Sequence, residues 1–405
     1  MMDSVSRPLG RRTALLGLAG VVGLGRSALA VAAAPGERRL VVVILRGALD
    51  GLSAVVPYGD AALAGHRTGL MPGLPGVAGG LLDMGGFFGL HPALAGLHGL
   101  YGAGEALVVH AVAGSWRNRS HFEAQDWMEF GAEQRLDSGW LNRVAGEMVA
   151  RGASGKARGK GADLALAVGS LMPVLLRGPA AVGNWMPATF QAPQADLYAR
   201  IAALHAADPV TGPAVAAGLR ERGFAEATLR GETRAAERFG FPALAAAAAK
   251  LLAAADGPRL AALEIGGWDT HANQADRLGG PLGQLDRGLV ALKTGLGEAW
   301  RETVVLVMTE FGRTVRVNGT RGTDHGTGTV AFVLGGNVAG GRVRGDWPGL
   351  AAGQLFEGRD LAPTTDLRSI AKGVLGPHLG LSGAALERVF PGSVAAAGMG
   401  GLLRG

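Results

Sequence analysis

A histidine beside an aspartate, within a short run of glycines and threonines, is the first feature of this sequence that could do chemistry. Gly322 to Thr329 reads GTDHGTGT and places Asp324 next to His325, directly before an apolar run. A carboxylate and a neutral imidazole are ligands that zinc accepts, and glycine lets the backbone bend and approach closely. The same pair is also common in surface turns, so a metal site requires ligands from other parts of the chain.

Other acidic, histidine and hydroxyl residues follow further apolar runs. Asp50 comes after the run at 38–47, Ser120 and His121 after 105–114, Asp269 and His271 after 258–267, and Glu310 and Arg313 at the end of 302–312. In open parallel sheets, ligands bind beyond the carboxyl ends of the strands. We therefore expect these residues to share one edge of a sheet with the Asp324–His325 pair, where carboxylates and imidazoles could hold a divalent metal.

The apolar runs themselves predict the scaffold. Each is a continuous segment typical of a strand buried on both faces, and the five lie at 38–47, 105–114, 258–267, 302–312 and 329–336. Helix-like patterns separate them, which favours an α/β fold: a doubly wound, mostly parallel sheet sandwiched by helices. We predict one such domain over 38–392, with an Ala-rich helical insertion at about 163–257.

Three of the candidate positions also have a purely structural interpretation. Ser120 and Glu123 form the S-x-x-E pattern of a capping box at the start of a helix. Asp269 could cap the helix that follows it, and Asp50 before a glycine suits a turn. These alternatives stay open at the level of sequence.

The remaining candidates differ in how readily structure alone accounts for them. Glu310 directly follows an apolar run, so a part-buried carboxylate there needs a partner, for which Arg313 is the obvious choice. His91 precedes a proline and is expected to cap a helix. We predict structural roles for the other histidines, which lack clustered partners: His66, His98, His110, His205 and His378.

The first 30 residues have the composition of an export signal. Arg11 and Arg12 precede an uncharged stretch, Thr13 to Gly25, which is too short to span a bilayer of ~30 Å at ~1.5 Å per residue. Twin arginines before a mildly apolar segment are the address of the Tat translocase, and small residues place the cleavage after Ala30. We therefore expect a periplasmic or secreted protein without a stable membrane span.

Composition excludes several other classes of function. The chain has no cysteine, which excludes disulfides, thiol catalysis and cysteine-ligated zinc. Residues 1–30 carry four arginines against one aspartate, so they account for +3 of the total net charge of +6. The remaining excess is small and scattered, which argues against a nucleic-acid partner. With 405 residues, 48% of them hydrophobic, the chain can bury a large core.

Six segments together resemble a known family. They are LVVVILRGALDGLSAVVPYGD, FFGLHPALAGL, VVHAVAGSWRNRSHFEAQDWME, GGWDTHANQ, LVMTEFGRTVRVNGTRGTDHGTGTVAFVLGG and GDWPGL. Over about 38–392, the chain is similar to the Tat-exported domain-of-unknown-function family 1501, which is placed in the alkaline phosphatase/sulfatase superfamily. The resemblance implies a doubly wound α/β sandwich with a two-metal site at the strand ends.

The resemblance also implies roles for individual residues. Asp50 would be the metal ligand after the first strand, and Ser120 the hydroxyl nucleophile that opens a helix. Asp269 and His271 would be ligands from a later strand end, although they are spaced more closely than is usual in the superfamily. His325 would be the final histidine, in a glycine-rich loop before a strand.

One position departs from the superfamily pattern. Where active phosphatases and sulfatases have an aspartate followed by histidine or asparagine, this chain has Glu310 followed by Phe311. One expected ligand is therefore an aromatic ring. Asp324 could compensate from the neighbouring loop; otherwise one metal is lost or the site is inert.

Two functions follow from these observations. The first is an exported hydrolase of phosphate or sulfate esters, which uses one or two ions of zinc, manganese or calcium and acts on a small anionic substrate. Ser120 would attack, beside His121, and Arg313 would stabilise the developing negative charge. The alternative is an inactive relative that serves as an envelope binding or assembly protein. The predicted metal ligands are Asp50, Asp269, His271, Glu310, Asp324 and His325.

Overall fold

The computed structural model describes most of the chain beyond the predicted signal. The described residues are 38–152, 164–187, 195–213, 215–216, 218–219, 228–229, 240–255 and 257–404. The predicted Tat signal at 1–30 and part of the predicted insertion at 163–257 lie outside them. Among the described helices, none combines the length and the apolar character needed to cross a membrane.

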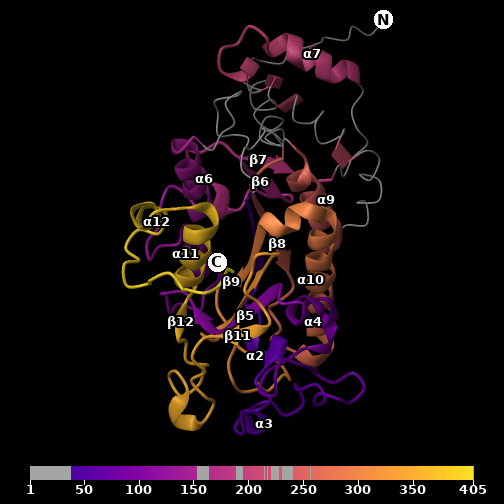
Figure 1. Ribbon diagram of the computed structural model, residues 1–405, viewed down its shortest axis with the longest axis vertical. Coiled ribbons are helices and arrows are strands. Elements are labelled where there is room, and N and C mark those ends of the chain that lie inside the picture. Colours follow the sequence, from indigo (N-terminus) through magenta and orange to yellow (C-terminus); the bar gives the residue numbers. More distant parts are fainter. Residues whose placement is uncertain are drawn as a thin grey trace, which may run out of the picture.

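A large, mostly parallel sheet forms the centre of the molecule (Figure 1). Its order is β11-β5-β10-β9-β1-β8-β6-β7, and β12 pairs with β5. The strand β10 runs antiparallel to both of its neighbours, and the other pairs are parallel. The strands are β1 (Arg39–Arg46), β5 (Ala106–Ala113), β6 (Ala165–Val168), β7 (Gly183–Trp185), β8 (Leu260–Gly266), β9 (Thr303–Thr309), β10 (Thr329–Leu334), β11 (Arg342–Arg344) and β12 (Thr365–Asp366).

Helices cover both faces of this sheet because alternate side chains of each strand point to opposite sides. On β1, Val41, Val43 and Leu45 belong to one hydrophobic cluster, while Leu40 and Ile44 belong to the other. The first cluster includes α4 (Ala95–Gly102), α9 (Phe241–Ala253) and α10 (Gln274–Leu296). The second includes α5 (His121–Phe130), α6 (Trp140–Ala150), α11 (Leu367–Leu379) and α12 (Gly383–Val389).

Smaller elements lie beside the sheet and complete the fold. A separate three-stranded sheet has the order β2-β4-β3. Its strands are β2 (Val55–Val56), β3 (Leu82–Asp83) and β4 (Gly89–Leu90). The short helices α2 (Gly51–Ala54) and α3 (Leu63–His66) follow β1, and α7 (Ala195–His205) lies at the end of the molecule beyond β6 and β7 (Figure 1).

The five predicted strands are confirmed as β1, β5, β8, β9 and β10, and so is the α/β class with a mostly parallel sheet flanked by helices. The expectation for 163–257 was incomplete. Helices α7 and α9 do occur there, but β6 and β7 also occur and extend the central sheet beyond β8. They were missed because β6 has only four residues and β7 three, which is too short for a periodic pattern.

The register of the central strands brings the predicted loops to one edge. Leu45 of β1 is paired with Ile265 of β8 on one side and with Thr309 of β9 on the other. All three strands therefore end at the same level. Because β10 is antiparallel, the loop before it also lies at this edge, and β5 ends there too. The loops at 47–50, 114–121, 267–273 and 310–328 thus meet.

Candidate metal centre

Glycines allow the loop that carries the Asp324–His325 pair to pack tightly against two neighbouring segments. A Cβ on Gly322 would lie 2.3 Å from the backbone carbon and oxygen of His271, and one on Gly326 would lie 2.3 Å from the backbone carbon of Arg313. Such distances are far inside van der Waals contact, so only glycine fits at these two positions. The close approach brings His325 next to His271.

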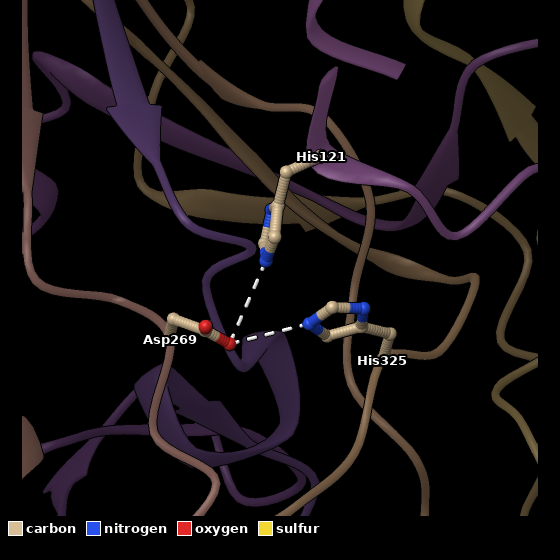
Figure 2. A group of neighbouring side chains, drawn as sticks. All are labelled: His121, Asp269 and His325. Carbon is tan, nitrogen blue, oxygen red and sulfur yellow. Dashed lines mark hydrogen bonds and ion pairs between the residues drawn. The ribbon is translucent and has the colours of Figure 1, made fainter. Parts of the chain in front are cut away.

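Three imidazole rings and one carboxylate converge at this edge. The Nε2 atoms of His271, His325 and His121 lie 3.0, 3.2 and 3.6 Å from Oδ1 of Asp269. The Nε2 atoms of His271 and His325 are 3.0 Å apart. Figure 2 shows the rings of His121 and His325 directed at the same oxygen. We call these four residues the metal centre, a name that marks them as a candidate site for an ion.

The other nitrogen of each ring has an acceptor that fixes its hydrogen. Nδ1 of His121 lies 2.8 Å from Oε1 of Glu310, Nδ1 of His325 lies 2.8 Å from the carbonyl oxygen of Arg119, and Nδ1 of His271 lies 3.2 Å from Oδ1 of Asp324. A carboxylate or carbonyl oxygen can only accept, so in the neutral rings Nδ1 carries the hydrogen. Each Nε2 is then left with a lone pair.

Lone pairs that face one another repel unless a cation lies between them. The Nε2 atom of His121 is buried and has no hydrogen-bond partner among the described residues. Four ligands bound to zinc at ~2.0–2.1 Å in a tetrahedron are about 3.3 Å apart. The separations of 3.0 to 3.6 Å lie on both sides of this value. A histidine whose Nδ1 is held by a carboxylate or carbonyl is also typical of metal ligands in proteins.

The pKa values of the centre reflect its surroundings. The hydrogen bond to Glu310 raises the pKa of His121 above its usual value, while burial opposes this shift. Burial lowers the pKa of His325. Burial alone would raise the pKa of Asp269, but the hydrogen bond from Arg313 and the nearby positive charge hold it below its usual range. The carboxylate is therefore ionised and one of the rings, His325, favours its neutral, ligand-competent form.

Arg313 holds the loops of the centre together. Its side chain is fully buried, and it donates to the carbonyl oxygens of Ala48, Thr323, Gly47 and Trp268. It also forms an ion pair with Asp269. The expectation that Arg313 pairs with Glu310 was therefore wrong, because its carboxylate partner is Asp269. Its predicted role in stabilising a developing charge stays a prediction.

Glu310, which the sequence had suggested as a metal ligand, contacts Nδ1 of His121, the ring nitrogen remote from the centre. Its Oε1 accepts from Gly47 N and Gln125 Nε2, both at 2.9 Å, as well as from His121, and its Oε2 accepts from Thr309 Oγ1 at 2.8 Å. Burial would raise its pKa, but these hydrogen bonds lower it below the usual value. Both oxygens are engaged, so Glu310 orients His121.

Asp50 belongs to a separate buried cluster. It forms an ion pair with Arg67 and accepts from Ser53 Oγ at 2.8 Å, from Leu52 N at 3.2 Å and from Gln274 Nε2. Its bonds thus go to groups outside the metal centre, and its backbone position caps α2. The turn interpretation of Asp50 is the one that agrees with these contacts, because Arg67 supplies its counter-charge.

Of two further helix-capping alternatives, the one for Asp269 is wrong and the one for Ser120 is right in position only. Ser120 occupies the N-cap position of α5, but its side chain forms no capping hydrogen bond, and Glu123 accepts from Asn118. Asp269 does not cap α10, whose N-cap is Asn273.

Asp324 is half exposed and accepts from Asn318 Nδ2 at 3.0 Å as well as facing His271.

The remaining histidines lie outside the centre. Nδ1 of His91 accepts from Ala93 N at 3.1 Å and caps a short 3-10 helix, as predicted. The others contact backbone carbonyls or a threonine elsewhere: His66, His98, His110, His205 and His378.

Four residues that support the centre or the neighbouring Asp50 cluster were not identified from the sequence. Arg67 neutralises Asp50, Gln125 and Arg119 contribute to the positions of His121 and His325, and Gln274 joins α10 to Asp50. Each acts across a large sequence separation through a common polar side chain or carbonyl group. Only Gln125 has a sequence signal. It follows His121 by four residues, which places both side chains on one face of α5.

These features define a mixed α/β protein with a candidate transition-metal centre at the carboxyl edge of its central sheet. The chain matches the family described as Protein of unknown function (DUF1501) over residues 102–390, and it belongs to this family. All four residues of the metal centre lie within the matched range. No curated protein matches the chain.

Proposed function

We propose that this protein is an exported, metal-dependent hydrolase of phosphate or sulfate esters, built on an alkaline phosphatase-like α/β core. The observation that carries the proposal is the convergence of three Nε2 atoms on Oδ1 of Asp269 at the carboxyl edge of the sheet. This edge is where α/β sheets bind ligands.

The donor set favours a transition metal. His121, Asp269 and His325 have ligand atoms that all lie within 4.8 Å of one another, and His271 adjoins two of them. Three imidazoles and one carboxylate suit zinc or manganese, whereas calcium prefers oxygen ligands. Such an ion supplies Lewis acidity toward an ester oxygen and acidifies a bound water or hydroxyl.

The chain's own groups would bind and orient an anionic ester at this place. The first backbone N–H groups of α5 follow Ser120, and a helix N-terminus favours an anion. The Ser120 hydroxyl is not engaged by the helix backbone, which leaves it available as the proposed nucleophile. Glu310 positions His121 through Nδ1, the ring nitrogen remote from the centre. Arg313 positions Asp269 through Oδ1, the oxygen that the three rings also face.

A second candidate function is binding without turnover, as an envelope binding or assembly protein. The ring of Phe311 stacks on His121, with centroids 5.0 Å apart, where the superfamily pattern expects a ligand. Asp50, the other expected ligand, is paired with Arg67. Both observations reduce the number of metal ligands below that of the superfamily pattern. They therefore favour a protein that binds a metal ion without catalysing hydrolysis.

Hydrolysis of model esters by metal-reconstituted protein distinguishes the two functions. We expect p-nitrophenyl phosphate or p-nitrophenyl sulfate to be cleaved by the zinc- or manganese-loaded protein, and the activity to be lost in His325→Ala. The matched control is His98→Ala, which removes a histidine outside the centre whose Nε2 contacts Asp83 O. Full metal loading without cleavage of either ester would support the binding function and contradict the hydrolase.

Export is part of the proposal and has its own test. A fusion of residues 1–30 to a folded reporter should reach the periplasm through the Tat translocase. Replacement of Arg11 and Arg12 by lysine should retain the reporter in the cytoplasm. Export of the lysine variant at the original level would contradict the Tat assignment.

A further inference from the structure

We infer that the centre binds one transition-metal ion, and that the Arg67 guanidinium provides, beside Asp50, the positive charge that a second ion would otherwise supply. The inference rests on the proposed metal-dependent function and narrows it. The resemblance stated above implies two ions with Asp50 among their ligands; the contacts of this chain do not fit that arrangement.

Asp50 has no free position for a metal. Its two oxygens accept from Leu52 N, Ser53 Oγ, Gln274 Nε2 and the two terminal nitrogens of Arg67. The aspartate is 1% exposed. The Arg67 ion pair and these hydrogen bonds lower its pKa against the effect of burial. An ion bound to Asp50 would have to displace several of these bonds inside the core.

Arg67 is fixed as firmly as the carboxylate it neutralises. It is 1% exposed, and beyond Asp50 its Nε donates to Val315 O at 2.7 Å and its Nη2 to Thr314 O at 2.8 Å. Removal of one partner of a buried ion pair leaves an uncompensated charge, which is strongly unfavourable. A metal ion at Asp50 would either expel the guanidinium or place two cations side by side.

Glu310 and Asp324 bond the Nδ1 side of the rings and other groups around the centre. Both oxygens of Glu310 accept hydrogen bonds, and Oδ1 of Asp324 is used by Asn318 and His271. The three Nε2 atoms all face Oδ1 of Asp269, which also forms the ion pair with Arg313. These atoms suffice for one tetrahedral ion.

Zinc stoichiometry and the metal environment test the inference without reference to activity. Purified protein without residues 1–30 would be stripped with chelator, saturated with zinc and analysed by mass spectrometry and X-ray absorption. We expect one equivalent of zinc in a nitrogen-rich shell, without the metal–metal distance of ~3.5–4 Å that two-ion sites give. Asp50→Asn should retain the equivalent, and His325→Ala should lose it.

Each outcome addresses a different claim. Two equivalents with a metal–metal distance would overturn the one-ion inference, whether or not esters are cleaved. One equivalent without ester cleavage would support the inference and contradict the proposed hydrolase. Zero equivalents would overturn both. If Asp50→Asn does not fold, the stoichiometry of the unaltered chain still decides the question.

Discussion

Two polar clusters lie at the same edge of the sheet and differ in the burial and the hydrogen bonding of their side chains. In the first, which we call the closed cluster, Asp50, Ser53, Arg67 and Gln274 are all at most 5% exposed and bond one another. In the metal centre, the side chains are 24 to 48% exposed and the ring nitrogens face each other. Buried polar groups are normally satisfied, and Nε2 of His121 is the atom of the centre that is buried without a hydrogen-bond partner among the described residues.

The difference lies in what each cluster contributes to the molecule. The closed cluster joins the loop after β1 to α3 and to the start of α10 through an ion pair and hydrogen bonds. Its bonds are complete without any other component. The metal centre joins three loops, and a cation bound between its ligand atoms would offset their mutual repulsion. We therefore expect substitutions in the closed cluster to lower the free energy of unfolding, and substitutions in the metal centre to lower the affinity for a metal ion.

The largest expected effect is on the closed cluster. Replacement of Arg67 by methionine should lower the free energy of unfolding by roughly 3–5 kcal/mol, because it leaves Asp50 buried without its counter-charge. Urea denaturation followed by circular dichroism measures this change, with Arg135→Met as an exposed control. A loss below about 1 kcal/mol would contradict the structural role of the pair.

Removal of a proposed metal ligand should change zinc affinity strongly and the free energy of unfolding only slightly. His325→Ala should weaken zinc binding more than ~100-fold, since loss of an outer partner alone typically costs ~10–100-fold. The metal-free variant should keep its free energy of unfolding within about 1 kcal/mol of the parent, because part-exposed ring atoms contribute little. Calorimetric titration with zinc and urea denaturation together test both halves. Unchanged zinc affinity would remove His325 from the centre.

A smaller effect on binding is expected behind the ligands. Glu310→Gln keeps the size of the side chain but removes the charge that holds Nδ1–H of His121. Zinc affinity should fall by ~10–100-fold, about 1.4–2.7 kcal/mol. Glu298→Gln, on an almost fully exposed side chain, is the matched control. Complete loss of binding in a folded Glu310→Gln variant would instead indicate that Glu310 is itself a ligand.

The smallest effect is a pH dependence of the metal-free protein. The pKa of His121 is raised in the folded state, so protonation of its ring stabilises the fold. This contribution is complete below the unfolded value of about 6.5 and is lost as the pH rises through the folded value. The melting temperature should therefore decline slightly more from pH 6 to 8 in the parent than in His121→Gln.

Bound zinc should reverse the direction in which the melting temperature changes with pH. This difference distinguishes the metal-loaded protein from the metal-free protein. A metal ion binds the neutral ring, so protons compete with it and binding weakens as the pH falls. The loaded protein should gain melting temperature over the range in which the metal-free protein loses it. The same slope in both states would show that His121 does not hold the ion.

The scaffold and the location of the site could be predicted from the sequence. Long apolar runs exclude water from both faces of a sheet, so they identify β1, β5, β8, β9 and β10 without any tertiary information. Polar residues directly after such runs must then lie at the edge of the sheet. This reasoning placed His121, Asp269, His271 and His325 near one another, and they do lie together.

The division of labour among the polar residues could not be predicted in this way. Residue type alone makes Asp50, Asp269 and Glu310 equally good ligands. Arg67 pairs with the first, Arg313 with the second, and His121 with the third.

Composition and periodicity therefore determined the sheet, its loops and the residue types brought to its edge. Tertiary structure alone decided which carboxylate faces the three rings and which are neutralised within the core. The physical reason is that a strand's burial follows from its own residues, whereas an ion pair depends on which distant groups compete for the same charge across a few ångströms.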